Sequence, residues 1–228
     1  MLGADWAPHL LAASIMGAPA GLVMAKLIVP ETEESKTMGG VSLSVERTES
    51  SVIEAAAKGA SDGMHLGFAV AAMLIAFISL VAMLNAGLGL MNAEVMKTVT
   101  FGLVSQPLSL ELVLGTIFAP LAFLMGVPWG EAMAVGNLIG QKLSLNEFVA
   151  YSNLKSSIAA GTISERAAMI ATFALCGFAN FSSIAQNVGG IGQMAPSRRG
   201  DLARLGLRAM LAGALASCMS AAIAGLLG

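Results

Sequence analysis

The stretch that decides the fold is "GFANFSSIAQNVGGIG", residues 177–192. It lies within a longer segment, 167–197, that carries no charge and is otherwise apolar enough to cross a membrane. Its asparagines, serines, glutamine and glycines are unexpected there, because lipid offers polar groups no partner. Either the segment unwinds to form a binding site, or its polar side chains join neighbouring helices that the glycines let approach closely. The residues alone favour neither interpretation.

Spacing within this stretch bears on its conformation. Asn180 and Ser183 are three residues apart, so on a helix they share a face and could contact one ligand. Phe178 precedes Asn180 by two residues, which is about 200° around a regular helix. The Phe178 ring and the Asn180 amide could therefore not contact the same ligand from a regular helix. Either Phe178 packs elsewhere or the helix unwinds here.

The composition of the whole chain indicates a membrane protein. Of 228 residues, 56% are hydrophobic and only 11% are charged, which is too few to cover a water-facing surface. The net charge of −2 gives no indication of a nucleic-acid partner. Cys176 and Cys218 stand in apolar segments without a further ligand at metal spacing, so we expect them to pack. No nucleophile with a base and no metal-ligand cluster is visible, and the sequence therefore predicts a protein that is not an enzyme.

Apolar runs of about 20 residues, enough to cross roughly 30 Å of hydrocarbon as helix, alternate with polar or interrupted segments. Proline and glycine break the runs in the middle third, and irregular backbone at membrane depth is tolerated only where it is buried or lines a cavity. The predicted fold class is an all-α membrane protein with transmembrane helices, a re-entrant helical hairpin and a discontinuous helix. The expected segments are a kinked transmembrane helix (1–30), a polar loop (31–50), an interfacial helix leading into a long transmembrane scaffold helix (51–98), an interfacial or half-helix segment (99–128), the re-entrant hairpin (129–160), the discontinuous transmembrane helix (161–197), and a basic loop with the C-terminal transmembrane helix (198–228).

Glu147, in "LSLNEFVAYSNL" (143–154), is the strongest single-residue signal. An ionisable group inside an apolar segment costs about 2.5–3.5 kcal/mol on insertion scales, so it usually faces a site or a partner. The alternative is that Glu147 ends a helix at the membrane interface or pairs structurally with Lys142 or Lys155. We expect Lys142 and Glu131 at the interface.

Four blocks of sequence together resemble one family. They are "AASIMGAPAGLVMAKLIVPETEE" (12–34), "LNEFVAY" (145–151), "CGFANFSSI" (176–184) and "VGGIGQMAPSRRGDLARLGLRA" (188–209). These blocks are similar to successive signatures of the concentrative nucleoside transporters, which are cation-coupled nucleoside symporters and include bacterial nucleoside permeases. The resemblance spans nearly the whole chain, and each block is too long and too ordered to follow from hydrophobic composition.

The resemblance implies a nucleoside importer in the plasma membrane, here a bacterial inner membrane, surrounded by lipid and coupled to Na⁺ or H⁺ without another cofactor. It implies a homotrimer in which each protomer binds a nucleoside between two re-entrant hairpins and two broken helices. The site would cross the membrane by an elevator motion. By the same resemblance, Glu147 would accept hydrogen bonds from the sugar hydroxyls. Asn180 and Ser183 would hold the ribose, and Phe178 would contact the nucleobase.

The resemblance covers only the family's C-terminal portion, because the chain starts where the fifth transmembrane helix of the family would start. The first hairpin, its partner broken helix and the sodium ligands would lie in an N-terminal half, so the metal-binding residues are unknown. We expect nucleoside transport to need that half. Purine or pyrimidine preference and the choice of Na⁺ or H⁺ stay open. The alternatives are a structural or pore-forming membrane subunit, a non-transporting fragment, and a transporter of the same architecture for another substrate.

Overall fold

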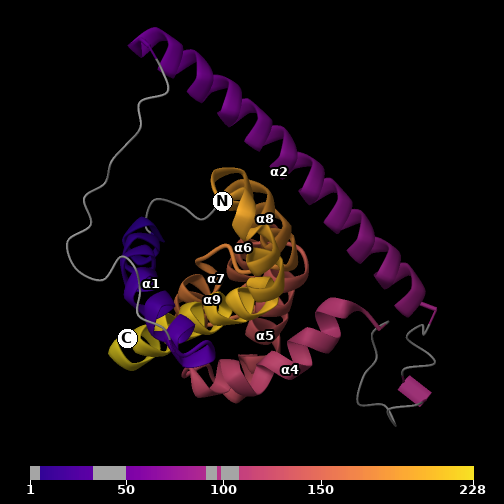
Figure 1. Cartoon of the computed structure of the whole chain (residues 1–228). Helices are drawn as coiled ribbons and strands as arrows, with labels where there is room; N and C mark the ends of the chain where they lie inside the picture. The colour runs from indigo at the N-terminus through magenta and orange to yellow at the C-terminus, as the bar shows by residue number, and fades with distance from the viewer. Residues whose placement is uncertain (1–5, 33–49, 91–96, 99–107) are drawn as a thin grey trace.

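The structure is a computed structural model that describes residues 6–32, 50–90, 97–98 and 108–228 (Figure 1). Within these ranges the regular secondary structure is helical and contains no strand, which confirms the all-α class. Most of the expected polar loop at 31–50, and 99–107 of the expected half-helix segment, lie outside the described residues. The helices are α1 (Ala7–Ile28), α2 (Val52–Leu88), α4 (Leu110–Leu124), α5 (Trp129–Ser144), α6 (Glu147–Ala159), α7 (Glu165–Leu175), α8 (Phe181–Met194), the 3-10 helix η2 (Pro196–Arg198) and α9 (Arg199–Leu227).

Among the described helices, α1 and α9 are long and apolar enough to cross a membrane by length and composition. The α2 helix runs without interruption for 37 residues. The Ser51 side chain caps its first turn by accepting a hydrogen bond from the backbone N–H of Glu54 at 3.1 Å. Figure 1 shows α2 extending well beyond the other helices. It packs against α8 and α4 and leaves large apolar side chains such as Phe68 and Ile75 exposed.

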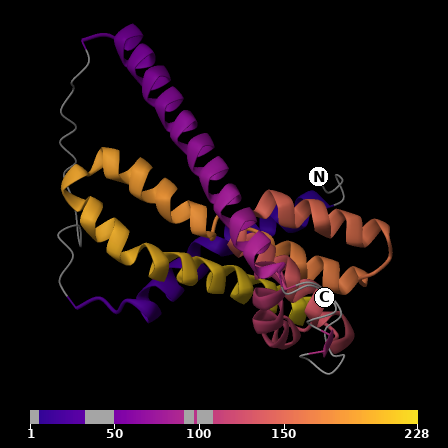
Figure 2. The ribbon, with the colours of Figure 1, turned by 90° about the vertical axis from the view of Figure 1, so that its right-hand side faces the viewer.

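The core lies between α7, α9 and the helices around them. Every α7 residue from Ile170 to Leu175 is buried. The α9 helix packs against α1, α7 and α8, and Figure 2 shows α8 and α9 joined at one end and running alongside each other. Alanine and glycine line much of these contacts, so the helix backbones can approach closely. The short α7 is therefore enclosed on several sides.

Small residues let the α4 and α5 helices pack closely against each other. A Cβ atom on Gly136 would lie 2.5 Å from the Gly115 carbonyl oxygen and 2.7 Å from the Ala119 nitrogen. No side chain fits there, because both neighbours are backbone atoms. Leu145 and Asn146 then connect α5 to α6, and these two helices also pack against each other.

The last helix begins earlier than the sequence suggests. We expected a basic loop from residue 198, but α9 begins at Arg199. Asp201 in its first turn accepts a hydrogen bond from Arg198 Nε at 2.8 Å and lies 3.7 Å from Arg204 Nη2. An acidic residue near a helix N-terminus and basic partners three residues away favour helix here. Arg198 and Arg204 therefore stabilise the start of α9 through Asp201, and the basic residues do not prevent helix formation.

Candidate functional site

Five residues, 176–180, separate the end of α7 from the start of α8 and are not helical. Gly177 has φ = +130°, a conformation that residues with a side chain rarely adopt. A Cβ atom on Gly177 would also lie 3.1 Å from Ser217 Oγ of α9. We call residues 176–180 the inter-helix segment. Its geometry depends on a glycine and on the close approach of α9.

Two helix N-termini meet near the inter-helix segment. The α6 helix starts at Glu147, after Asn146, whose Oδ1 accepts a hydrogen bond from Val149 N at 2.9 Å. The α8 helix starts after Asn180, whose Oδ1 accepts from Ser183 N at 2.8 Å. Helix N-termini carry partial positive charge and favour negative groups nearby. The Glu147 carboxylate is therefore in a favourable electrostatic environment.

Glu147 and Asn180 are hydrogen-bonded across these termini. The Asn180 Nδ2 atom donates to Glu147 Oε2 at 3.1 Å. Asn180 is 2% exposed, and Glu147 is partly exposed. Within the described ranges, Glu147 Oε1 accepts no hydrogen bond, so the carboxylate keeps capacity for hydroxyl donors. The Asn180 Nδ2 atom donates no second hydrogen bond to the described residues, so one N–H of the amide is also available.

Asn180 and Ser183 lie together, but not as two neighbours on one helix face. Asn180 is the N-cap of α8, with extended backbone, and the two residues form a reciprocal capping box. Ser183 Oγ accepts from Asn180 N at 3.2 Å and donates to Asn180 O at 2.6 Å, while Ser182 Oγ donates to Asn180 Oδ1 at 2.7 Å. Asn180 is therefore both the helix cap and the donor that orients Glu147.

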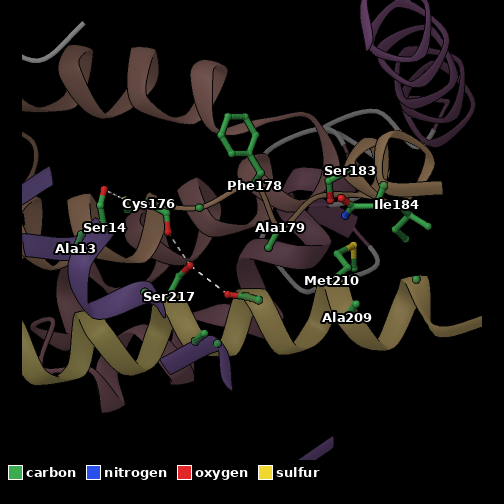
Figure 3. Close-up of a pocket in the computed structure, with 17 residues that line it drawn as sticks. Ala13, Ser14, Cys176, Phe178, Ala179, Ser183, Ile184, Ala209, Met210 and Ser217 are labelled. Carbon is green, nitrogen blue, oxygen red and sulfur yellow. Dashed lines mark hydrogen bonds between the residues drawn. The ribbon is translucent and has the colours of Figure 1, made fainter. Parts of the chain in front are cut away.

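Phe178 lies apart from this hydrogen-bonded group. Its side chain is 74% exposed, and Figure 3 shows the ring pointing away from Ser217 and α9. Phe178 and Ser183 both line a cavity of about 480 Å³ between the inter-helix segment, α1, α8 and α9, whereas Glu147 and Asn180 do not. The structure thus brings Glu147, Asn180 and Ser183 into one cluster, and Phe178 adjoins it through the cavity.

Lys142 lies in a different place from the one predicted. We expected it at the membrane interface, but it is 1% exposed, and its Nζ donates to Ala174 O at 2.9 Å and to Ser217 Oγ at 3.1 Å. The prediction was wrong because the last turn of α5 packs against α7, which local hydropathy does not report. A charged residue within "LIGQKLSL" (138–145) is the same signal that singled out Glu147. Ser217 is an uncharged small residue in an apolar helix, so the sequence did not indicate that it would bind Lys142.

Glu131 of α5 is partly buried and accepts two hydrogen bonds from the residue that caps α7. Ser164 N and Ser164 Oγ donate to Glu131 Oε2 at 3.0 and 2.8 Å. This carboxylate therefore joins the starts of α5 and α7. In the part of the chain that the structure describes, no group of three or more His, Cys, Asp or Glu side chains could hold a metal ion.

Comparisons with known proteins match almost the whole chain. Residues 9–225 match the family described as "Na+ dependent nucleoside transporter C-terminus". The "Uncharacterized transporter YutK" of Bacillus subtilis is 54% identical over 96% of this chain and 52% of its own length. The "Nucleoside permease NupC" of Helicobacter pylori is 43% identical over 96% of this chain and 50% of its own length.

Solved structures of CNTnw are also similar to almost the whole chain. One in an "intermediate 3 state" is 48% identical, with a TM-score of 0.80 over 96% of this chain and 51% of that one. Others capture CNTnw in outward-facing and in inward-facing substrate-bound states. The chain spans about half the length of the relatives it matches. These relatives are transporters and not enzymes, as predicted. The chain is therefore a membrane protein that belongs to the Na⁺-dependent nucleoside transporter family, of which it carries the C-terminal region.

Proposed function

We propose that this chain is the C-terminal half of a cation-coupled nucleoside importer, with Glu147, Asn180, Ser183 and Phe178 in its binding site. The observation that carries the proposal is the hydrogen bond between Glu147 at the start of α6 and Asn180 at the start of α8. It joins two polar helix ends inside a chain that is otherwise largely apolar. Such a pair is costly in a membrane unless it serves a site.

Helix lengths support a re-entrant hairpin and a discontinuous helix as part of this proposal. The 16 residues of α5 and the 13 residues of α6 span about 24 and 20 Å, less than the roughly 30 Å of a bilayer core. The 11 residues of α7 and the 14 of α8 are also each too short. Together, α7 and α8 are long enough to cross. Short helices that end inside the bilayer place polar helix termini at the depth of a substrate site.

The chemistry of the cluster suits the uncharged, hydroxyl-rich sugar of a nucleoside. Oε1 of Glu147 can accept a hydrogen bond from a sugar hydroxyl, and the second N–H of Asn180 can donate one to a sugar oxygen. Ser183 borders the cavity of about 480 Å³, and the exposed ring of Phe178 offers an apolar surface for a base. A site that satisfies each hydroxyl rejects analogues lacking one, because the unpaired buried group costs about 1–3 kcal/mol.

The proposal extends to mechanism and assembly. The family's description supports Na⁺ as the coupling ion, with H⁺ as the alternative, and no residue of this chain is proposed as a cation ligand. Solved relatives in outward- and inward-facing states support alternating access, which we propose occurs by an elevator motion. We further propose a homotrimer in a bacterial inner membrane. The exposed apolar side chains of α1 and α2 would suit lipid or a neighbouring copy.

Calorimetry tests the site on the complete transporter, either as one polypeptide or as this chain together with a chain that supplies the family's N-terminal half. Detergent-purified protein is titrated with uridine or adenosine, with Na⁺ present or replaced by choline, at two pH values. Glu147→Gln and Asn180→Ala should each weaken binding severely. His65→Ala, an exposed position on α2, should leave binding unchanged. Unchanged binding in Glu147→Gln would refute the proposed site.

A further inference from the structure

A buried lysine sits beside the proposed site without a carboxylate partner. Lys142, two residues before the end of α5, is 1% exposed. In the described part of the chain, no carboxylate oxygen lies within 4.0 Å of its ammonium group. A buried charge is costly unless it is compensated. Its hydrogen-bond acceptors are instead the Ala174 carbonyl and the Ser217 hydroxyl.

These partners lie where the end of α7 leaves carbonyl groups without helical donors. In a continued helix, the N–H of Phe178 would donate to Ala174 O, but Phe178 belongs to the inter-helix segment. Lys142 Nζ donates to Ala174 O instead, at 2.9 Å. Ser217 Oγ, which accepts from Lys142, donates to Cys176 O at 2.8 Å. One lysine and one serine therefore satisfy two carbonyl groups that the interruption leaves free.

A positive side chain precedes the connection between α5 and α6, and a negative side chain follows it. Each of the two bonds to a helix end of opposite partial charge. Lys142 lies at the carboxyl end of α7, where the helix dipole is negative. Glu147, five residues later, bonds to the cap at the amino end of α8, where the dipole is positive. The two bonds hold the inter-helix segment from both sides.

We propose that Lys142 is a positioning residue for the nucleoside site. Its ammonium group holds the carboxyl end of α7, directly and through Ser217, and so fixes the backbone that presents Asn180 to Glu147. This inference rests on the proposed function. Loss of Lys142 should therefore selectively weaken recognition of the sugar hydroxyls, beyond any general loss of folded protein.

The test compares a nucleoside with its 2′,3′-dideoxy analogue on the complete transporter in detergent. The measured quantity is the dissociation constant of the dideoxy analogue divided by that of the nucleoside. This ratio does not change when only the folded fraction falls. Lys142→Met keeps the side-chain length and removes the charge, and should lower the ratio by about tenfold. Ser217→Ala removes one link and should lower it by about threefold.

Two control variants match the two substitutions. Lys155→Met removes an exposed lysine of α6. Ser220→Ala removes a buried serine of α9 whose hydroxyl, among the described residues, donates to Ala216 O of its own helix. Both should keep the wild-type ratio. If Lys142→Met gives no folded protein, the ratio in Ser217→Ala decides, and a wild-type value there overturns the role of Lys142.

The outcomes separate this inference from the function on which it rests. A wild type that binds nucleoside and dideoxy analogue equally overturns the proposed site. A wild type that discriminates, with a Lys142→Met variant that keeps the same ratio, overturns the positioning role alone. A reduced ratio in Lys142→Met and Ser217→Ala, with both controls unchanged, supports it.

Discussion

Replacing Asn180 by serine separates the two tasks that the structure gives this residue. Asn180 caps α8 through Oδ1 and donates from Nδ2 to Glu147 at 3.1 Å. Serine is about as good an N-cap as asparagine, so Asn180→Ser should keep the helix start. Its shorter side chain ends before it reaches Glu147. Asn180→Ala should lose both functions.

The magnitude follows from the geometry of the Asn180–Glu147 bond. Hydrogen bonds to charged groups contribute about 1.5–3 kcal/mol, and a length of 3.1 Å with a partly exposed carboxylate places this one at or below the low end. A loss of about 1–1.5 kcal/mol corresponds to a rise of roughly 5- to 12-fold in the nucleoside dissociation constant. Because the bond is already present in the free protein, the free energy of unfolding should fall by about the same 1–1.5 kcal/mol in Asn180→Ser. Asn180→Ala should cost about 1 kcal/mol more through loss of the cap.

A double-mutant cycle by calorimetry on the complete transporter checks this reasoning. In a Glu147→Gln background the remaining bond is neutral and about half as strong, so Asn180→Ser should cost only about two- to threefold there. His65→Ala provides the control background, in which the full effect of Asn180→Ser should persist. Independent effects, with the same fold-change of Asn180→Ser in both backgrounds, would refute the claim that Asn180 acts through Glu147.

Three further predictions concern the helix framework and the coupling ion. Gly136→Ala should lower the melting temperature by about 2–12 °C, because overpacking against backbone costs about 1–3 kcal/mol, while Gly130→Ala, with nothing within 4 Å, should not. Equal melting temperatures in a fluorescence-based thermal assay would contradict the α4–α5 contact. Gly177→Ala should destabilise the protein by about 1–3 kcal/mol, since its φ of +130° is strained for alanine. An unaltered denaturation midpoint would count against the geometry of the inter-helix segment. Replacing Na⁺ by choline at constant pH should reduce nucleoside-induced thermal stabilisation, and a shift independent of Na⁺ that instead follows pH would favour H⁺ as the coupling ion.

Much of the helical framework could be predicted from the sequence, because it depends on local properties. Hydropathy indicates where helices can cross a membrane, and α1 and α9 have the expected length and composition. Helix-capping residues are also local. Asn146 and Asn180 each precede a helix that begins at the next residue. A basic loop was expected from residue 198, but the structure has helix from Arg199. Side-chain pairs within one helical turn stabilise the helix there.

The site was only partly accessible to the same reasoning. Glu147 stood out by its charge in an apolar run, but the identity of its partner did not follow from local spacing. Spacing placed Asn180 and Ser183 on one helix face, whereas the structure brings them together as a capping box. The assumption of a shared helix face failed because Asn180 lies just outside α8 with φ = −142°. The roles of Phe178 and of the whole cluster in nucleoside binding stay predictions.

The sequence by itself determined the membrane class, the family and the residues that deserve mutation, because composition and ordered motifs need no knowledge of distant contacts. Only the tertiary structure decided that Glu147 bonds to Asn180 and that Lys142 is buried against the end of α7. The physical reason is that each bond joins helices well separated along the chain. Whether a charge lies at a membrane interface or inside a protein depends on which other helices pack around it, and local hydropathy carries no such information.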